Sequence, residues 1–303
     1  MRHNKLMVTV LLLLLSVGAA RGQGLGAPGA VTEPNEFGVV DYSMRIITAT
    51  GIGAIPTNAP NVGMARANAI RAAKLDALRN LVEAVKAVRI TSETTVMNNM
   101  VSSDVIRTQV EAMVRGARQV GDVKYLSDAS VELSMTVPMS GIMDAVLPAS
   151  AAVATPGEDQ PIAFLPGIAG AANRALAPAA GASVALAIAG QPITGLIIDT
   201  RGLGVKPSMS PRVFTSDGSV IYGPGNYPRD FAVTQGVVGY HKDIAAAKLD
   251  SRVAGNPLTI KGTATQGTFG TDVVIATRDA QQAAGYAGFA EALSNCRVMF
   301  ILD

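Results

Sequence analysis

The feature that most constrains the fold is a long run of apolar residues at three- and four-residue spacing between Asn61 and Val88. This spacing predicts a helix with one apolar stripe, and charged side chains largely occupy its other face. Asn61 follows Pro60 and is placed to cap the start of the helix. Such a helix needs a sheet or a partner to bury its stripe, which consists of Ile70, Ala73, Ala77, Leu78, Leu81, Val82, Val85 and Val88.

Around this helix, the sequence predicts an α+β domain over residues 41–147. The alternation of residue types favours strands at 42–50 and 88–96. Ser103 is expected to cap a second helix at 104–115, which Gly116 ends. A hairpin is expected to join strands at 119–126 and 129–137 across Ser127-Asp128. The simplest arrangement places two helices on one face of a mainly antiparallel sheet.

A second α+β domain is predicted over residues 193–303, after an Ala/Pro/Gly-rich linker at 148–192. The final apolar strand is expected to be central in its sheet. The predicted fold is therefore two small domains, each a mainly antiparallel sheet with helices packed on one face. The expected elements of the second domain are strands at 195–200, 212–214, 219–222, 258–264, 272–276 and 297–302, and helices at 244–249 and 280–293.

Residues 1–22 have the features of a cleavable export signal. Arg2 and Lys5 precede an apolar run from Leu6 to Val17, and small residues follow it. That run is shorter than the roughly 20 residues of a permanent membrane helix, although an uncleaved anchor is the alternative. A lipoprotein signal would need a cysteine at the cleavage point, and the single cysteine is Cys296. Residues 23–40 are expected to be a flexible leader.

The net charge after export argues against a nucleic-acid partner. Loss of Arg2, Lys5 and Arg21 from the 25 basic residues leaves 22, against 23 acidic residues, and the net charge is then −1. Nucleic-acid binding would need a concentrated positive surface. Because there is one cysteine, no intramolecular disulfide can form. Cys296 is therefore expected to be a small buried side chain.

The sequence shows no catalytic constellation. His241 is the one histidine outside the predicted signal, which argues against a metal site of several histidines and against a nucleophile–histidine triad. We interpret Asp199 and Arg201 as a partly buried ion pair. The glycine pairs in Gly51-Ile-Gly53 and Gly202-Leu-Gly204 are interpreted as turns that end strands, because neither has phosphate-loop spacing. We therefore predict no catalytic, cofactor-binding or metal-binding residues, no cofactor, and no enzyme activity.

The segment from residue 42 to 141 resembles a module of small outer-membrane lipoproteins, the Lpp-twenty type. The resemblance is carried by Ala49-Thr-Gly-Ile-Gly53, by Ala65-Arg-Ala-Asn-Ala-Ile-Arg-Ala-Ala-Lys-Leu-Asp-Ala-Leu-Arg-Asn-Leu-Val-Glu83 and by Val88-Arg-Ile-Thr-Ser-Glu-Thr-Thr-Val96. A related module occurs in the flagellar assembly protein T, FlgT. The second domain resembles a region attached to that module in other envelope proteins.

The resemblance implies a non-catalytic protein of the periplasm or outer membrane, with a structural or assembly role and a flagellar association as one option. Envelope or flagellar basal-body proteins are its expected partners, without a direct lipid anchor and with self-association as a further option. The alternative hypothesis is a periplasmic module that binds a small ligand or glycan between the domains. Asp199, Arg201 and the aromatic loop at 222–231, interpreted as exposed, are its first candidate residues.

Overall fold

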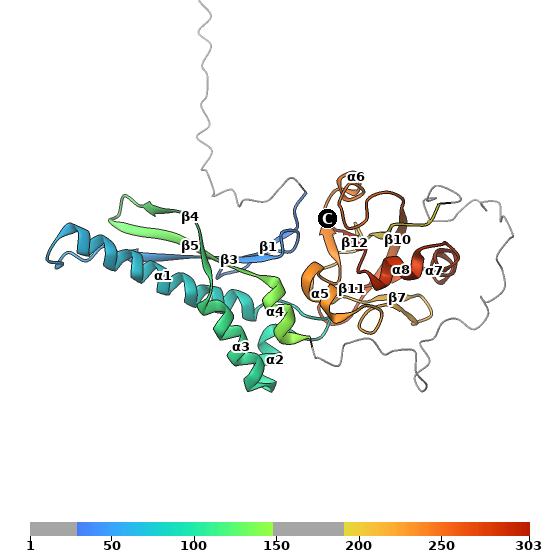
Figure 1. Cartoon of the computed structure of the whole chain (residues 1–303), viewed down its shortest axis with the longest axis horizontal. Helices are drawn as coiled ribbons and strands as arrows, with labels where there is room; N and C mark the ends of the chain where they lie inside the picture. The colour runs from blue at the N-terminus through green and yellow to red at the C-terminus, as the bar shows by residue number, and fades with distance from the viewer. Residues whose placement is uncertain (1–28, 148–190) are drawn as a thin grey trace, which may run out of the picture.

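The computed structural model describes residues 29–147 and 191–303. They form two α+β domains that lie end to end, the first around a five-stranded sheet and the second around a seven-stranded sheet (Figure 1). The predicted α+β class is confirmed. The predicted signal at 1–22 and almost all of the predicted linker at 148–192 lie outside the described residues.

The sheet of the first domain is antiparallel throughout, with the strand order β1-β2-β3-β5-β4. The described part of the predicted leader is not a flexible segment, because it supplies β1 and β2 at the sheet edge. Pairing to β3 thus orders this segment. The strands are β1 (Thr32–Pro34), β2 (Val39–Asp41), β3 (Ile46–Ala54), β4 (Arg118–Tyr125) and β5 (Ser130–Pro138).

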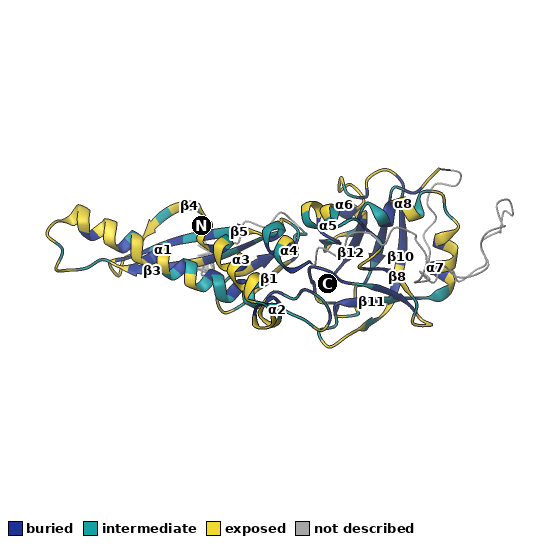
Figure 2. Ribbon diagram, turned by 60° about the horizontal axis from the view of Figure 1, so that its bottom comes forward, coloured by how far each residue is buried: buried dark blue, intermediate teal, exposed yellow. Residues whose placement is uncertain are grey.

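Helix α1 (Val62–Lys86) lies along one face of this sheet, and Asn61 caps it by accepting a hydrogen bond from the amide of Met64. The predicted helix and cap are confirmed, but the buried stripe differs from the predicted one. It consists mainly of alanines, whereas Ile70, Leu78 and Val82 are half-buried beside it. Figure 2 shows the opposite side of α1 exposed. The fully buried stripe is Ala65, Ala69, Ala73, Ala77, Leu81, Ala84 and Val85.

Small residues are needed on α1 because β3 approaches it very closely. Gly51 and Gly53 lie inside β3 and face the helix, so their interpretation as a strand-ending turn was wrong. A Cβ on Gly51 would lie 2.1 Å from the amide nitrogen of Ala77, and one on Gly53 would lie 2.1 Å from the carbonyl oxygen of Ala69. Beyond the end of β2, α1 also covers the open edge of β3, where Asp76 accepts the amide hydrogen of Ile52 at 3.0 Å.

The strand predicted at 88–96 does not form. Residues 88–95 make a loop closed by one isolated bridge between Arg89 and Thr95. The loop leads into α2 (Val96–Ser102) and α3 (Asp104–Arg115), and α4 (Met139–Val146) follows β5. Ser103 caps α3 and Gly116 ends it, as predicted. The predicted hairpin of β4 and β5 is also confirmed.

The sheet of the second domain is mixed, with the strand order β8-β7-β11-β10-β6-β12-β9. It was predicted to be mainly antiparallel, and this is wrong: β7–β11, β10–β6, β6–β12 and β12–β9 are parallel pairs. The predicted hairpin of β7 and β8 forms, and β12 has a neighbour on both sides as expected. The strands are β6 (Gly195–Asp199), β7 (Val213–Thr215), β8 (Val220–Tyr222), β9 (Gly239–His241), β10 (Pro257–Gln266), β11 (Asp272–Ile275) and β12 (Val298–Ile301).

Both faces of this sheet are covered, which corrects the prediction of helices on one face. Leu196, Ile198 and Phe300 face the main core, whereas Ile197 and Ile301 pack with the region of α6. Burial on both faces is typical of parallel strands and explains the continuous apolar sequence of β12. The helix predicted at 280–293 is divided by a turn that contains Gly288 at φ 85°. The helices are α5 (Arg229–Gln235), α6 (Ile244–Ala247), α7 (Thr277–Ala284) and α8 (Phe289–Ser294).

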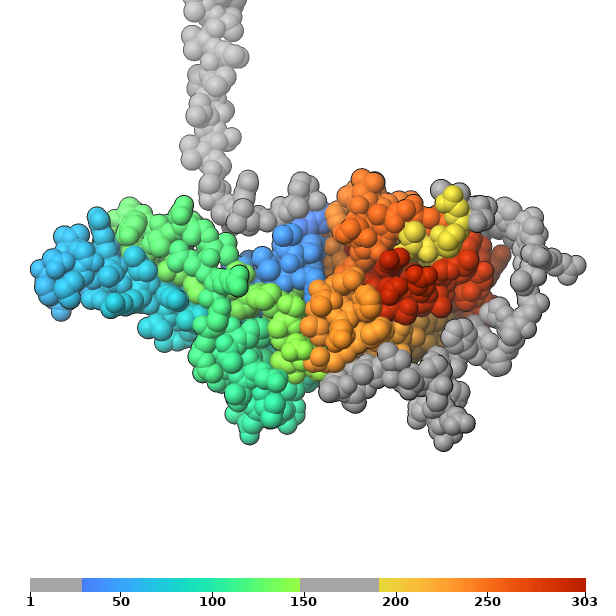
Figure 3. Space-filling model, in the orientation of Figure 1, coloured from blue at the N-terminus to red at the C-terminus, as the bar shows by residue number. Residues whose placement is uncertain are grey.

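The loop at 88–95 joins the two domains, which are in contact in Figure 3. Its backbone carbonyls at Arg89 and Ile90 accept hydrogen bonds from the amides of Met209 and Ser210, at 2.9 and 2.7 Å. A second contact lies at α4, where Arg229 forms an ion pair with Asp144 at 2.8 Å. Backbone hydrogen bonds and an ion pair thus both link the two domains.

Candidate functional site

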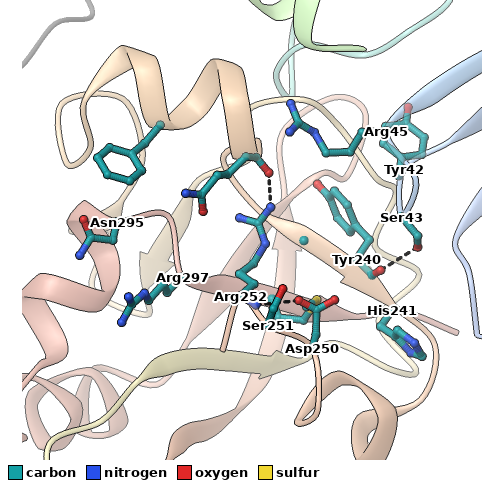
Figure 4. Close-up of a pocket in the computed structure, with 14 residues that line it drawn as sticks. Tyr42, Ser43, Arg45, Tyr240, His241, Asp250, Ser251, Arg252, Asn295 and Arg297 are labelled. Atoms are coloured by element: carbon teal, nitrogen blue, oxygen red, sulfur yellow. Dashed lines mark hydrogen bonds between the residues drawn. The ribbon is translucent and has the colours of Figure 1, made fainter. Parts of the chain in front are cut away.

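A cavity of about 640 Å³ lies where the first domain meets the second (Figure 4). Its volume is within the range of about 300–1,000 Å³ that is typical of small-ligand sites. The first domain supplies one wall from the turn before β3. In the second domain, α5, β9, the segment after α6, the end of α8 and the start of β12 supply the rest. Its charged side chains are those of Arg45, Arg252, Arg297 and Asp250, and its other polar side chains include those of His241, Gln235, Ser251 and Asn295.

The wall from the first domain is a tight turn at residues 41–45. The carboxylate of Asp41 accepts the amide hydrogen of Met44 at 2.7 Å, which closes the turn. Arg45 has a left-handed backbone conformation with φ 57°, which is uncommon for a residue other than glycine. The Ser43 hydroxyl donates to the carbonyl oxygen of Tyr240 at 2.8 Å and ties the turn to β9.

Two half-buried arginines from different domains meet at the C-terminal end of α5. Arg45 donates to the carbonyl oxygens of Val233, at 2.8 Å, and Thr234. Arg252 donates to those of Gly236, at 3.0 Å, Gln235 and Cys296. These contacts satisfy carbonyl groups that a helix end leaves without partners. Burial, together with the charge of Arg252, lowers the pKa of Arg45, and burial likewise lowers the pKa of Arg252.

Arg297 is the third guanidinium in the lining, and it is exposed. In the view of Figure 4, Arg252 lies between Arg45 and Arg297. None of the three forms an ion pair with a carboxylate of the described residues. By contrast, Arg201, Arg212 and Arg229 of the second domain are all paired with carboxylates.

Aromatic rings form the floor of the cavity. Tyr42 and Tyr240 come from different domains and pack edge to face, with their ring centroids 5.7 Å apart. Tyr240 packs in the same way on Phe300, at 5.9 Å. The Tyr240 hydroxyl donates to the carbonyl oxygen of Ser208 at 2.8 Å. Burial raises the pKa of both tyrosines well above the usual value, so both phenols stay neutral.

The predicted candidate residues lie largely outside this cavity. Asp199 and Arg201 form the expected ion pair, with a closest distance of 2.6 Å, and neither lines the cavity. The loop at 222–231 was interpreted as exposed, and this is wrong for its aromatics, because Tyr222 and Tyr227 are fully buried. Phe231 is the one residue of that loop in the lining.

His241 and Cys296 have ordinary structural surroundings. His241 ends β9 at the rim of the cavity, and its Nδ1 accepts the amide hydrogen of Asp243 at 2.9 Å. Cys296 is buried, as predicted, and burial raises the pKa of its thiol. Among residues 29–147 and 191–303, no group of three or more His, Cys, Asp and Glu side chains is placed to hold a metal ion. Over the same ranges, no helix has the length and apolar character to cross a membrane.

Sequence reasoning missed the three arginines because they are far apart in the chain. Arg45, Arg252 and Arg297 belong to no common motif, and tertiary folding alone brings them together. The nearest available signal was that no acidic residue stands beside Arg45 or Arg297 in the sequence. That signal is weak, because neighbours in the sequence say nothing of the carboxylates that folding brings near.

The fold and the cavity define a two-domain α+β protein in which a helix-covered antiparallel module is docked to a separate mixed-sheet domain. Residues 55–132 match the family model described as LPP20 lipoprotein, and residues 195–303 match the model of the second domain of Treponema pallidum Tp0624. The chain therefore carries an LPP20-type module and a separate C-terminal domain, which confirms the resemblance to the Lpp-twenty type for residues 55–132. No curated protein matches the chain.

Proposed function

We propose that this chain is a non-catalytic, exported envelope protein with a structural or assembly role at the periplasmic side of the outer membrane. The observation that carries the proposal is the match of residues 55–132 to the LPP20 lipoprotein model. The export features of residues 1–22 agree with it. A flagellar association is the narrower form of the proposal and rests on the resemblance to FlgT.

The domain interface supports a structural role. The loop at 88–95 pairs through its backbone with residues 209 and 210, and Arg229 is paired with Asp144. Hydrogen bonds and packing across both contacts make the two domains one elongated body (Figure 1). An elongated body of this kind suits a spacer or adaptor between envelope components.

We propose that outer-membrane association occurs through protein contacts. The family name refers to lipoproteins, but the single cysteine here is Cys296, which is buried before the last strand. It is not available for acylation in the folded protein. Envelope proteins or basal-body proteins are therefore the proposed partners, rather than lipid.

Fractionation of cells that express the native protein tests this proposal. We expect it in the outer-membrane fraction and expect urea or alkaline carbonate to release it without detergent. Co-purification with flagellar basal bodies would support the narrower form. A freely diffusing periplasmic monomer, without an associated protein after crosslinking in living cells, would contradict the structural role.

A second function, the binding of a small ligand between the domains, is favoured by the 640 Å³ cavity. Both domains contribute to its walls, so a ligand there would depend on the docked arrangement. Calorimetric titration of the purified protein with small polar compounds tests it. A loss of binding heat in Arg45→Met, which changes one of the three lining side chains of the first domain, would support the function, and an equal response from that variant would oppose it.

A further inference from the structure

The strongest unexplained feature of the cavity is its charge. Arg45, Arg252 and Arg297 line it, and Asp250 is the single carboxylate among the lining residues. The lining therefore carries a net charge of about +2 without counting His241. The carboxylate of Asp250 already accepts the amide hydrogen of Arg252 at 2.8 Å.

The contacts to α5 do not neutralise these arginines. Each guanidinium has five N–H donors, whereas Arg45 uses donors on Nη1 and Nη2 for two carbonyl oxygens and leaves Nε without a hydrogen bond. Carbonyl oxygens are dipoles without net charge, so these contacts leave the positive charge of each guanidinium without a counter-charge. The side chain of Arg297 makes no hydrogen bond or ion pair with the described residues, so all the N–H groups of its guanidinium are available to a ligand. Paired N–H groups of this type suit carboxylate or phosphate oxygens.

The uncharged part of the lining suits a hydroxylated ligand. Gln235, Ser251 and Asn295 surround the arginines and can donate to or accept from hydroxyl groups. Tyr42 and Tyr240, each only 4% exposed, close the base of the cavity beneath these groups. Few convergent polar groups over an aromatic floor are typical of small-ligand sites.

We propose that the interdomain cavity binds a small hydroxylated molecule through an anionic group, a carboxylate or a phosphate, held by Arg297 and Arg252 with Arg45 beside them. This inference rests on the second function proposed above and names its ligand class. It is independent of where in the envelope the protein resides.

Titration calorimetry with three compounds that share one ring tests the inference: glucose, glucuronate and glucose 6-phosphate. We expect at least one of the two anions to bind at least tenfold more tightly than glucose, which corresponds to about 1.4 kcal/mol. The affinities of the two anions then distinguish a carboxylate from a phosphate ligand. We also expect the affinity to fall as salt is raised, since salt screens the charges.

The variant Arg297→Gln tests the residue assignment, because its exposed side chain has no partner whose loss could disturb folding. We expect it to weaken anion binding at least tenfold with an unchanged melting temperature. Arg278→Gln is the matched control, since Arg278 is an exposed arginine of α7 outside the cavity. It should bind like the native protein.

Three outcomes would overturn the inference. Equal affinity for glucose and both anions would remove the anion preference and leave a neutral-ligand function standing. Equal loss in the two variants would show that bulk charge, not the cavity, attracts the anion. If none of the three compounds bound at millimolar concentration, by heat or by a shift in melting temperature, the inference would be wrong, whereas the broader ligand-binding function and the envelope role would still stand.

Discussion

The hydroxyl of Ser92 in the first domain donates a hydrogen bond to the fully buried carboxylate of Asp272 in the second, at 2.7 Å. Arg212 completes the cluster, since its amide and its Nε both donate to Asp272 at 2.9 Å. The same guanidinium reaches Glu93 of the first domain. A buried negative charge at the domain boundary is thus satisfied jointly by both domains.

Replacement of Asp272 by Asn should destabilise the protein by about 3 kcal/mol, because it leaves Arg212 without its buried partner. Chemical unfolding at neutral pH measures the loss. Asp199→Asn is the matched control, because Asp199 also pairs with an arginine but at a more exposed site within one domain. That variant should lose less than about 1 kcal/mol. Equal losses in the two variants would show that the cluster around Asp272 stabilises the protein no more than an exposed ion pair does.

Gly51→Ala should be costly because the new methyl group would meet the backbone of α1 at Ala77, not a movable side chain. Overpacking of this type costs about 1–3 kcal/mol, and we expect the upper end here. The control is Ile52→Ala, in the same strand but on the opposite, half-exposed side. It should change the free energy of unfolding by less than about 1 kcal/mol. A larger loss at Ile52 than at Gly51 would contradict the close packing of β3 on α1.

The buried tyrosines predict a loss of stability at alkaline pH. Burial raises the pKa of Tyr227 from 10.0 to about 12, so its phenol stays protonated when the unfolded chain has already ionised. The contribution of the neutral Tyr227 phenol to the free energy of unfolding is therefore complete below pH 10. It falls by about 1.4 kcal/mol per pH unit between pH 10 and 12. Burial raises the pKa of Tyr222 and Tyr240 as well, and their effects add in the same direction.

Tyr227→Phe isolates this effect. At pH 7 the variant should be less stable by about 1 kcal/mol, because the contact of the Tyr227 hydroxyl with Ser210, at 3.2 Å, is lost. The gap to the native protein should narrow or reverse as pH rises from 10 to 12. Unfolding curves at several pH values measure this, and parallel pH dependence in the two proteins would count against a raised pKa at Tyr227.

Features that depend on neighbouring residues were predictable from the sequence. Asn61 and Ser103 cap their helices as expected, because a capping side chain and its amide partner lie three residues apart. The strands flanking Asp217-Gly218 and Ser127-Asp128 were also predicted, because turn residues act locally.

Features that depend on distant segments were not predictable. The sequence at 88–96 alternates like a strand. In the fold, however, the amides of residues 209 and 210 donate to its backbone carbonyls, and the segment links the two domains. In the sequence, Gly51 and Gly53 resemble a turn that ends a strand. Their actual role, close packing without a Cβ, is apparent only when α1 lies against β3. The cavity is a further example, because Arg45 and Arg252 are neighbours only after the domains dock.

Intact-mass measurement of the protein recovered from fractionated cells tests the central proposal, export to the envelope, most directly. We predict a product that begins at Gln23 or Arg21, consistent with removal of the basic and apolar head, and that is found in the envelope fraction. A product that still begins at Met1 and is recovered with cytosolic proteins would contradict the envelope role and the partners proposed with it.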